Sequence, residues 1–242
     1  MSPSLSNSIV GVVGLVGENV LKCRATDGYE KSPNFCRKSL KFDAKNLTLC
    51  DNCRTFASKK KIKMKEFSEL IKTRRSMRQF TDELLNGDDV KMLLRAGLMA
   101  PSSKGLHSYE FVVVEDKEML AALSQCKQVG SDFLAGAPLA IVVLADPAVS
   151  DVWIEDASVA ATHILLQAED LGLGACWIQM RNRQDAEGRP TEEIVKSLLG
   201  IPEDRGVVCI IAVGHKGMER KPQNEERLKW ERVHIGGMKN EE

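Results

Sequence analysis

The sequence lacks any apolar stretch long enough to cross a membrane as a helix. Its most apolar run, residues 8–20, is short and interrupted by glycines, whereas a transmembrane helix needs about 20 apolar residues. The run also lacks a basic leading segment and an obvious small-residue cleavage site, so a secretory signal is not favoured. Lys and Arg equal Asp and Glu at 34 each, so the bulk charge indicates neither a nucleic-acid partner nor a membrane partner.

Several common cofactor and catalytic motifs are also absent. There is no Gly-x-Gly-x-x-Gly turn after a strand and no phosphate loop ending in Gly-Lys-Ser or Gly-Lys-Thr. This excludes the usual dinucleotide-binding turn and the phosphate loop of nucleotide hydrolases. No His-Glu-x-x-His or Gly-x-Ser-x-Gly occurs either. The histidines are too scattered to predict a metal cluster, and His163 is expected to be a core or interface residue.

Charge and cysteine usage divide the chain into two parts. Residues 1–64 hold 12 Lys and Arg against 5 Asp and Glu, and the remainder holds 22 against 29. The first part shows no sustained helical or strand period. We therefore expect residues 1–63 to be a basic, cysteine-containing extension and residues 64–242 to form the folded domain, with Met64 as one possible original start. Seven cysteines are an odd number for a disulfide framework, which favours a reducing, cytoplasmic location.

The extension leaves two interpretations open. Its CxxC pair together with two further cysteines could close a tetrahedral zinc site. However, 12 residues separate those two cysteines from each other and 13 separate the second from the CxxC pair, so they do not form a second pair. Disorder is therefore preferred, and no metal site is predicted. The alternative zinc ligands are Cys23, Cys36, Cys50 and Cys53. The other cysteines lie in apolar patterns and are expected to be inert core residues: Cys126, Cys176 and Cys209.

From residue 64 onward, helical and strand patterns follow one another without a strict βαβ order. Apolar spacing predicts helices at 65–74, within 86–101, and at 116–126, 153–171 and 191–200. Strands are expected at 109–116, 138–146, 174–180 and 206–214, and residues 228–237 are expected to form a last short strand or an arm. The pattern indicates an α+β fold, with helices packed around a central sheet.

Local signals refine this outline. Phe67, Leu70 and Ile71 share one face of the first helix, and Asp88 is placed to cap the second. Gly172 and Gly200 are expected to end their helices. The uninterrupted valines of residues 112–114 predict a strand that is covered on both faces.

Two loops carry most of the polar chemistry. The stretch TRRSMRQF places Arg74, Arg75 and Arg78 within five positions. Such a cluster is either a solvated basic turn or a phosphate site, because guanidinium forms forked, charge-assisted hydrogen bonds with phosphate oxygens. The stretch APSSKGLHSYEF, residues 100–111, joins a helix to a buried strand. It is either a plain connection or a loop that presents N–H groups, hydroxyls and a lysine to a ligand.

The order of the motifs resembles the nitroreductase family of flavin-dependent oxidoreductases. RRSMRQF is followed by APSSKGLHSYEFVVV, LGLGACWIQ, LGIPED and AVGHKG, and the resemblance covers about residues 65–235. It implies a nitroreductase-like central sheet, mixed but mainly antiparallel, flanked by helices. It also implies FMN as the cofactor, NAD(P)H as the electron donor and a homodimer with shared flavin sites, which the small side chains of the helix at 153–171 would suit.

The resemblance further implies which residues line the flavin. Arg74 and Arg78 would serve phosphate and ribityl oxygens, while Arg75 and Ser76 would lie nearer the ring. The second flavin loop, which the partner subunit contributes, matches Ser102, Ser103, Lys104, Gly105 and His107. The remaining matches are Trp177, Ile178 and Gln179 at a strand end, Gly214, His215 and Lys216 in the turn after the last core strand, and Arg227, which returns to the phosphate.

The chain departs from the family pattern in three places. Many relatives carry Asn where Gly105 stands, Gln-Pro-Trp at residues 107–109, and Gly-Tyr-Pro where this chain has residues 214–216. These departures affect the tuning of the ring and the choice of substrate.

No catalytic side chain is predicted, because a flavin would carry the chemistry. The resemblance implies a ping-pong reaction in which NAD(P)H gives up hydride and leaves, and a nitroaromatic or quinone takes its place. Arg75 or Lys216 would supply a cation for the reduced ring. Two alternatives stay open: other flavin chemistry, such as dehalogenation, flavin cleavage or enone reduction, and a flavin- or zinc-binding sensor module. Nucleic acid is not expected, since residues 1–55 contain few aromatic side chains for stacking: Tyr29, Phe35 and Phe42.

Overall fold

The computed structural model describes residues 66–238. The expected extension of residues 1–63 lies outside the described residues, together with Cys23, Cys36, Cys50 and Cys53. Within residues 66–238, no helix is both long and apolar enough to span a bilayer.

A four-stranded antiparallel sheet forms the centre of the domain. Its strands are β1 (Tyr109–Val114), β2 (Leu139–Ala145), β3 (Leu173–Gln179) and β4 (Gly206–His215). They are ordered β1-β2-β4-β3, so β1 and β3 are the edges. A single parallel bridge, between Ser76 and Ala175, lies outside the named strands. The expected α+β class with a mainly antiparallel sheet is confirmed.

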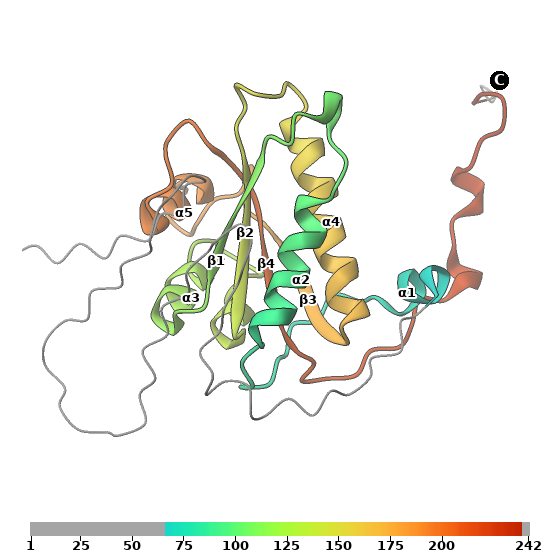
Figure 1. The fold of residues 1–242 in the computed structure, drawn as a ribbon, viewed down its shortest axis with the longest axis horizontal. Helices are drawn as coiled ribbons and strands as arrows, with labels where there is room; N and C mark the ends of the chain where they lie inside the picture. The colour runs from blue at the N-terminus through green and yellow to red at the C-terminus, as the bar shows by residue number, and fades with distance from the viewer. Residues whose placement is uncertain (1–65, 239–242) are drawn as a thin grey trace, which may run out of the picture.

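Helices cover both faces of the sheet (Figure 1). On one face lie α2 (Gly87–Leu98) and α4 (Trp153–Asp170), and on the other lie α3 (Lys117–Ser124) and α5 (Thr191–Leu199). The alanines of α4 are fully buried against the sheet. Each face therefore has its own apolar core, and β2 and β4, buried along most of their length, separate the two.

The valine-rich strand β1 is covered on both faces, as its sequence predicts. Val113 packs against the core beneath α2 and α4, and Val112 packs against the opposite core. Both side chains remain partly exposed, because β1 lies at an edge of the sheet.

The predicted helix caps are correct at two positions and wrong at one. Gly200, with φ 63°, follows α5, and Gly172, with φ 75°, follows the C-cap of α4. The prediction that Asp88 caps α2 is wrong. The helix begins at Gly87, two residues earlier than a cap at Asp88 would allow, and the side-chain oxygen of Asn86 accepts the bond from the Asp89 N–H at 2.8 Å.

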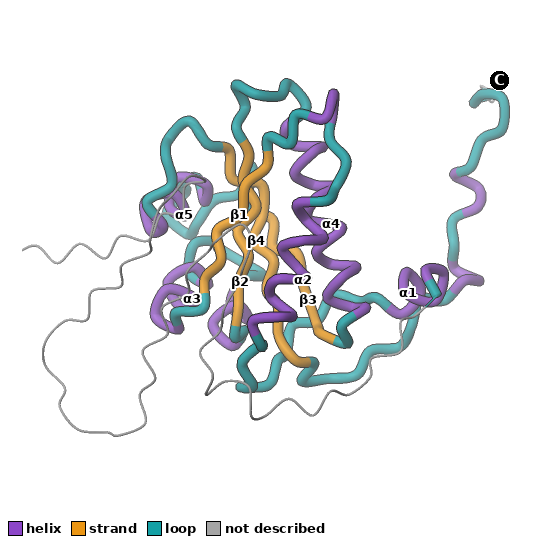
Figure 2. The backbone as a smooth tube through the Cα atoms, in the orientation of Figure 1, coloured by secondary structure: helices purple, strands orange, loops and turns teal. Residues whose placement is uncertain are grey.

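The first helix and the C-terminal arm, residues 217–238, project together from the domain (Figure 2). In α1 (Phe67–Thr73), Leu70 is buried, but Phe67 and Ile71 are 64% and 48% exposed. The arm contains two short 3₁₀ turns, Glu225–Arg227 and Trp230–Arg232. Of the two alternatives for residues 228–237, the arm is therefore correct and the strand is wrong.

Candidate functional site

The arginine-rich segment lies against the outer edge of β3. The Met77 N–H donates to the Ala175 carbonyl at 3.0 Å, and Ser76 forms the parallel bridge with Ala175. Gly174 makes this close approach possible, because a Cβ at that position would lie 2.9 Å from the Met77 Cβ. The arginine motif therefore lies beside the first residues of β3, the strand that ends in the predicted residues 177–179.

The same segment continues along the end of β4. The Thr81 N–H donates to the His215 carbonyl at 3.1 Å, and the Gly217 N–H donates to the Gln79 carbonyl at 2.9 Å. A Cβ at Gly214 would lie 2.9 Å from Phe80 Cδ1, so this glycine is also needed for close packing. The predicted turn of residues 214–216 thus lies beside the arginine segment.

Three guanidinium groups lie near enough to the thiol of Cys176 to act on its charge. Burial raises the pKa of this thiol, while Arg78, the Ser76 hydroxyl, Arg220 and Arg74 act in the opposite direction. Within residues 66–238, no carboxylate forms an ion pair with these three arginines, and Arg78 lies 5.8 Å from the centre of the Phe133 ring. The cluster is therefore an uncompensated positive region suited to an anion.

Arg220 was not predicted from the sequence. It lies in the arm, far from the arginine motif along the chain, and no spacing signal connects the two. The folding of the arm back toward β3 brings it into the cluster.

The arm is tied to the end of α1. The Arg75 guanidinium donates to the Lys221 carbonyl. The Gln223 N–H donates to the Lys72 carbonyl at 2.8 Å, and the Lys72 ammonium lies 2.9 Å from Glu225. Arg227 follows two residues later, so this predicted phosphate ligand lies on the part of the arm that runs past α1.

Lys216 is held by an acidic residue that the sequence did not reveal. Its ammonium lies 2.8 Å from Glu169 Oε2, and only 4% of the Glu169 side chain is exposed. The neighbouring His215 points elsewhere, with Nε2 3.8 Å from Glu83 Oε1. The positive charge of Lys216 is therefore largely neutralised within the protein, which leaves Arg75 as the better candidate for a cation beside a reduced ring.

The predicted residues of β3 point to different sides. Trp177 and Gln179 share one face, where the indole N–H donates to Gln179 Oε1 at 3.0 Å. Ile178 is 1% exposed and packs in the core beneath α3 and α5. Its side chain cannot contact a surface ligand, so only its backbone could do so.

The second predicted loop lies at the other end of α4. The Ser103 N–H donates to Asp156 Oδ1 at 2.8 Å, and the Ser150 hydroxyl donates to Asp156 Oδ2 at 3.0 Å. The His107 N–H donates to the Ser102 hydroxyl oxygen at 2.9 Å. The buried carboxylate of Asp156, which was also not identified from the sequence, fixes the start of the loop.

A single chain therefore carries the predicted residues in two separate groups. The loop of residues 102–107 is anchored at Asp156 in the first turn of α4, and the Lys216 turn is anchored at Glu169 in the last. These anchors are about 20 Å apart along the helix axis, at a rise of about 1.5 Å per residue.

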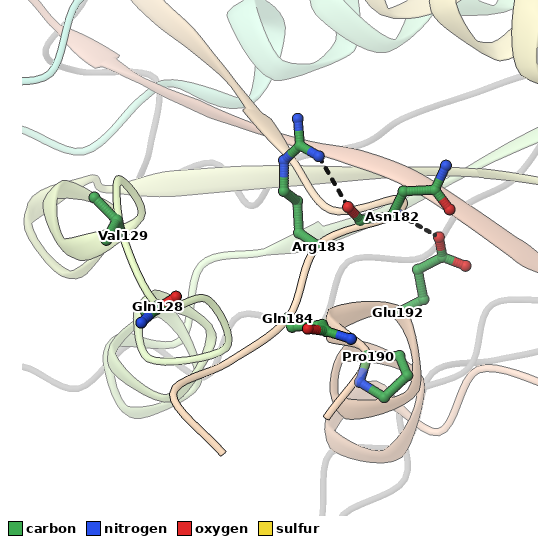
Figure 3. Close-up of a pocket in the computed structure, with 7 residues that line it drawn as sticks. All are labelled: Gln128, Val129, Asn182, Arg183, Gln184, Pro190 and Glu192. Carbon is green, nitrogen blue, oxygen red and sulfur yellow. Dashed lines mark hydrogen bonds between the residues drawn. The ribbon is translucent and has the colours of Figure 1, made fainter. Parts of the chain in front are cut away.

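An open hollow of about 660 Å³ lies elsewhere, between the end of α3 and the start of α5 (Figure 3). It contains none of the predicted site residues. The Arg183 guanidinium donates to the Asn182 carbonyl at 2.8 Å, and the Asn182 N–H donates to Glu192 Oε1 at 3.1 Å, as Figure 3 shows. Since its one arginine is already bonded and a carboxylate lines it, this hollow is less suited to a phosphate than the arginine cluster.

Comparison with known proteins agrees with the geometry. The family model described as "Nitroreductase family" matches residues 71–126 and 120–215. An FMN-dependent nitroreductase of Clostridium difficile R20291 is 45% identical, with a TM-score of 0.68, over 70% of this chain and 98% of that chain. An Archaeoglobus fulgidus protein with the provisional name NADH dehydrogenase/NAD(P)H nitroreductase is 34% identical over 71% of this chain and 98% of its own length.

An NADPH-flavin oxidoreductase of Vibrio harveyi is 28% identical over 66% of this chain and 69% of its own length. The archaeal and clostridial proteins are covered almost completely, so the similarity extends over the whole domain rather than one motif. The chain belongs to the nitroreductase family.

Proposed function

We propose that the protein is an FMN-dependent oxidoreductase that takes hydride from NAD(P)H and reduces electron-poor small molecules of the nitroaromatic or quinone type by a ping-pong mechanism. The observation that carries this proposal is the arginine cluster around Cys176, which has no carboxylate partner in the described part of the chain. Guanidinium groups bind phosphate through paired, charge-assisted hydrogen bonds. When bound, FMN would supply the hydride chemistry, which no side chain can provide.

The residues at the edge of β3 fit this cofactor. Arg74, Arg78 and Arg220 supply positive charge, Ser76 supplies a hydroxyl, and Gly174 keeps the segment close to the sheet. We assign the phosphate and ribityl oxygens to these arginines, with Arg227 of the arm as a further phosphate ligand. Arg75 and the backbone of residues 177–179 would lie by the ring.

We further propose a homodimer in which each flavin site combines both chains. The separation of the two predicted groups along α4 supports it, because the loop of residues 102–107 would complete the partner's site. The large apolar side chains left exposed on α1, at the end of α2 and on the arm also support it, since uncovered apolar surface often marks an interface. They include Phe67, Leu98, Met99, Trp230, Val233 and Ile235.

The names of the relatives support the reaction class. The Clostridium difficile protein is called an FMN-dependent nitroreductase, and the Vibrio harveyi protein an NADPH-flavin oxidoreductase. In such a reaction one open face of the flavin ring serves the donor and the acceptor in turn. It therefore needs no separate dinucleotide-binding fold, which is consistent with the absence of a Gly-x-Gly-x-x-Gly turn. A cytoplasmic location remains a prediction from the cysteine count.

The test is the visible absorption spectrum of the purified protein, recorded before and after anaerobic addition of NADPH and then NADH. We expect a flavin band that one nucleotide bleaches and that a quinone restores. A band that neither nucleotide bleaches would favour the alternative flavin chemistries on the same fold. Protein that shows no band even after FMN is added, and that carries stoichiometric zinc, would overturn the proposal in favour of a zinc-binding module.

A further inference from the structure

The side chain of His107 begins a hydrogen-bonded chain that fixes its tautomer. Its Nδ1 lies 2.8 Å from the Tyr109 hydroxyl oxygen, and that hydroxyl donates its only proton to the Ala100 carbonyl at 2.6 Å. A carbonyl oxygen can only accept, so the Tyr109 oxygen must accept from His107. Nδ1 of His107 therefore carries a proton, and the other ring nitrogen, Nε2, is the atom that gains or loses one.

The backbone presents this ring outward in a strained conformation. His107 has φ 47°, a left-handed value that is uncommon for residues other than glycine, and its neighbours Lys104 and Gly105 have φ 53° and 66°. The ring stands nearly perpendicular to the Tyr109 ring at 5.7 Å, and the residue as a whole is exposed. Such strain persists only where surrounding contacts impose it, and it clusters at functional sites.

The groups around His107 preserve the arrangement over a wide pH range. Burial raises the pKa of Tyr109, and the Asp156 carboxylate raises it further, so the phenol keeps the proton that it donates to Ala100. Charged groups near the loop include Lys104 itself and Asp156 on α4, which is engaged with Ser103 and Ser150. Asp146, whose backbone N–H donates to the Ser108 carbonyl, is paired with Arg205. The Tyr109 oxygen therefore stays available to accept the bond from Nδ1 of His107.

We propose that His107 is a catalytic residue that donates a proton from Nε2 to the acceptor substrate in the flavin site of the partner subunit, with Tyr109 as its positioning residue. The inference rests on the proposed function and adds to it a named acid. Reduction of a quinone takes up one hydride, which NAD(P)H supplies by way of FMN, and leaves the hydroquinone monoanion. The Nε2–H bond breaks, the proton completes the hydroquinone, and solvent returns a proton to the ring.

The first test reads the tautomer directly, without activity. In protein labelled with ¹⁵N-histidine, long-range ¹H–¹⁵N spectra at high pH should show one histidine with Nδ1 protonated and Nε2 bare, and that signal should be absent in His107→Gly. In Tyr109→Phe it should change toward a mixture of tautomers. A wild-type His107 signal with the proton on Nε2 would overturn the proposal.

The second test separates the two half-reactions in the holoenzyme. His107→Gly removes the ring, and glycine relieves the backbone strain at φ 47°. We expect NAD(P)H still to bleach the flavin band of this variant, so that the reoxidation step can be measured separately. Reoxidation by duroquinone should slow about 100-fold, a typical contribution of a general acid, and millimolar imidazole should restore most of that loss. As a matched control, His163→Gln, on α4, should alter neither half-reaction.

The outcomes are distinct from those that test the proposed function. If wild type is not bleached by either nucleotide, the proposed function fails, whatever the tautomer. If wild type is bleached and His107→Gly reoxidises at the wild-type rate, or reoxidises slowly with no response to imidazole, the proton-donor role is overturned while the proposed function stands.

Discussion

The ammonium of Lys216 lies 2.8 Å from the buried carboxylate of Glu169, and this pair joins the end of β4 to the last turn of α4. The Lys216 stem passes over Gly174, where an added Cβ would lie 3.3 Å from Lys216 Cγ. One ion pair thus connects β4, α4 and β3, and the arginine segment runs along the edge of the last of these.

Replacing Lys216 should destabilise the domain. In Lys216→Met the buried Glu169 loses its contact with the Lys216 ammonium, and breaking a buried pair costs about 3–5 kcal/mol. Because Lys216 is 21% exposed, we expect a loss of about 2–3 kcal/mol. Urea unfolding at a fixed FMN concentration measures it. Lys229→Met, which removes an exposed pair with Glu231 at 3.7 Å, should leave the midpoint unchanged. Equal midpoints for the two variants would contradict the structural role assigned to the Glu169 pair.

Arg74→Ala should weaken FMN binding without unfolding the protein. The change removes charged hydrogen bonds worth about 1.5–3 kcal/mol, which corresponds to a rise in Kd of about 10- to 150-fold. Fluorescence titration of apoprotein with FMN gives the Kd. The control is Arg95→Ala, at the exposed end of α2. If Arg74→Ala binds FMN as tightly as the control does, Arg74 is not a ligand of the cofactor.

Gly174→Ala should disturb the arginine segment through its backbone position. The added methyl would lie 2.9 Å from the Met77 Cβ, so β3 and the segment must separate, and such overpacking costs about 1–3 kcal/mol. We expect lower stability together with weaker FMN binding. Gly136→Ala is the matched control, since nothing lies within 4 Å of a Cβ there. Normal FMN affinity in Gly174→Ala would show that the contact with Met77 does not position the arginines.

The stabilising effect of Asp185 should depend on pH. Burial raises the pKa of this carboxyl, but the backbone N–H and guanidinium of Arg189 act in the opposite direction, and the net pKa lies below its ordinary value. A depressed folded-state pKa contributes stability above the unfolded-state pKa of about 4, and this contribution is lost as the pH falls through the folded-state value.

The difference in unfolding midpoint between wild type and Asp185→Asn should therefore be constant near neutral pH and shrink below about pH 4. Thermal unfolding across that range measures the difference. A difference that grows on acidification would show that the sign is wrong.

The local pattern of the sequence determined the elements of the fold. The helical spacing of the alanines in α4 and the apolar runs of β2 and β4 come from short-range periodicity, which sets which face is buried. Glycines after α4 and α5 likewise act through their own backbone angles. The order of the motifs was also sufficient to indicate the family, because it depends on the sequence alone.

The sequence-based predictions were wrong where a helix boundary, or the surface that covers a helix face, depends on residues outside the local pattern. The N-cap of α2 shifted by two residues because the helix starts at Gly87. Phe67 and Ile71 match the apolar face of a helix, yet both are exposed, because none of residues 66–238 covers α1 on that side. Periodicity shows that a face is apolar but does not show what covers it.

The composition of the candidate site was decided mainly by the tertiary structure. The sequence identified Arg74, Arg78 and the loop of residues 102–107, but not Arg220, Glu169 or Asp156, since each contacts residues distant along the chain. It also could not indicate that Ile178 points into the core, or that Tyr109 fixes the proton of His107. Residue types and their order are local properties, whereas charge neutralisation and tautomer depend on distances that exist only once the chain is folded.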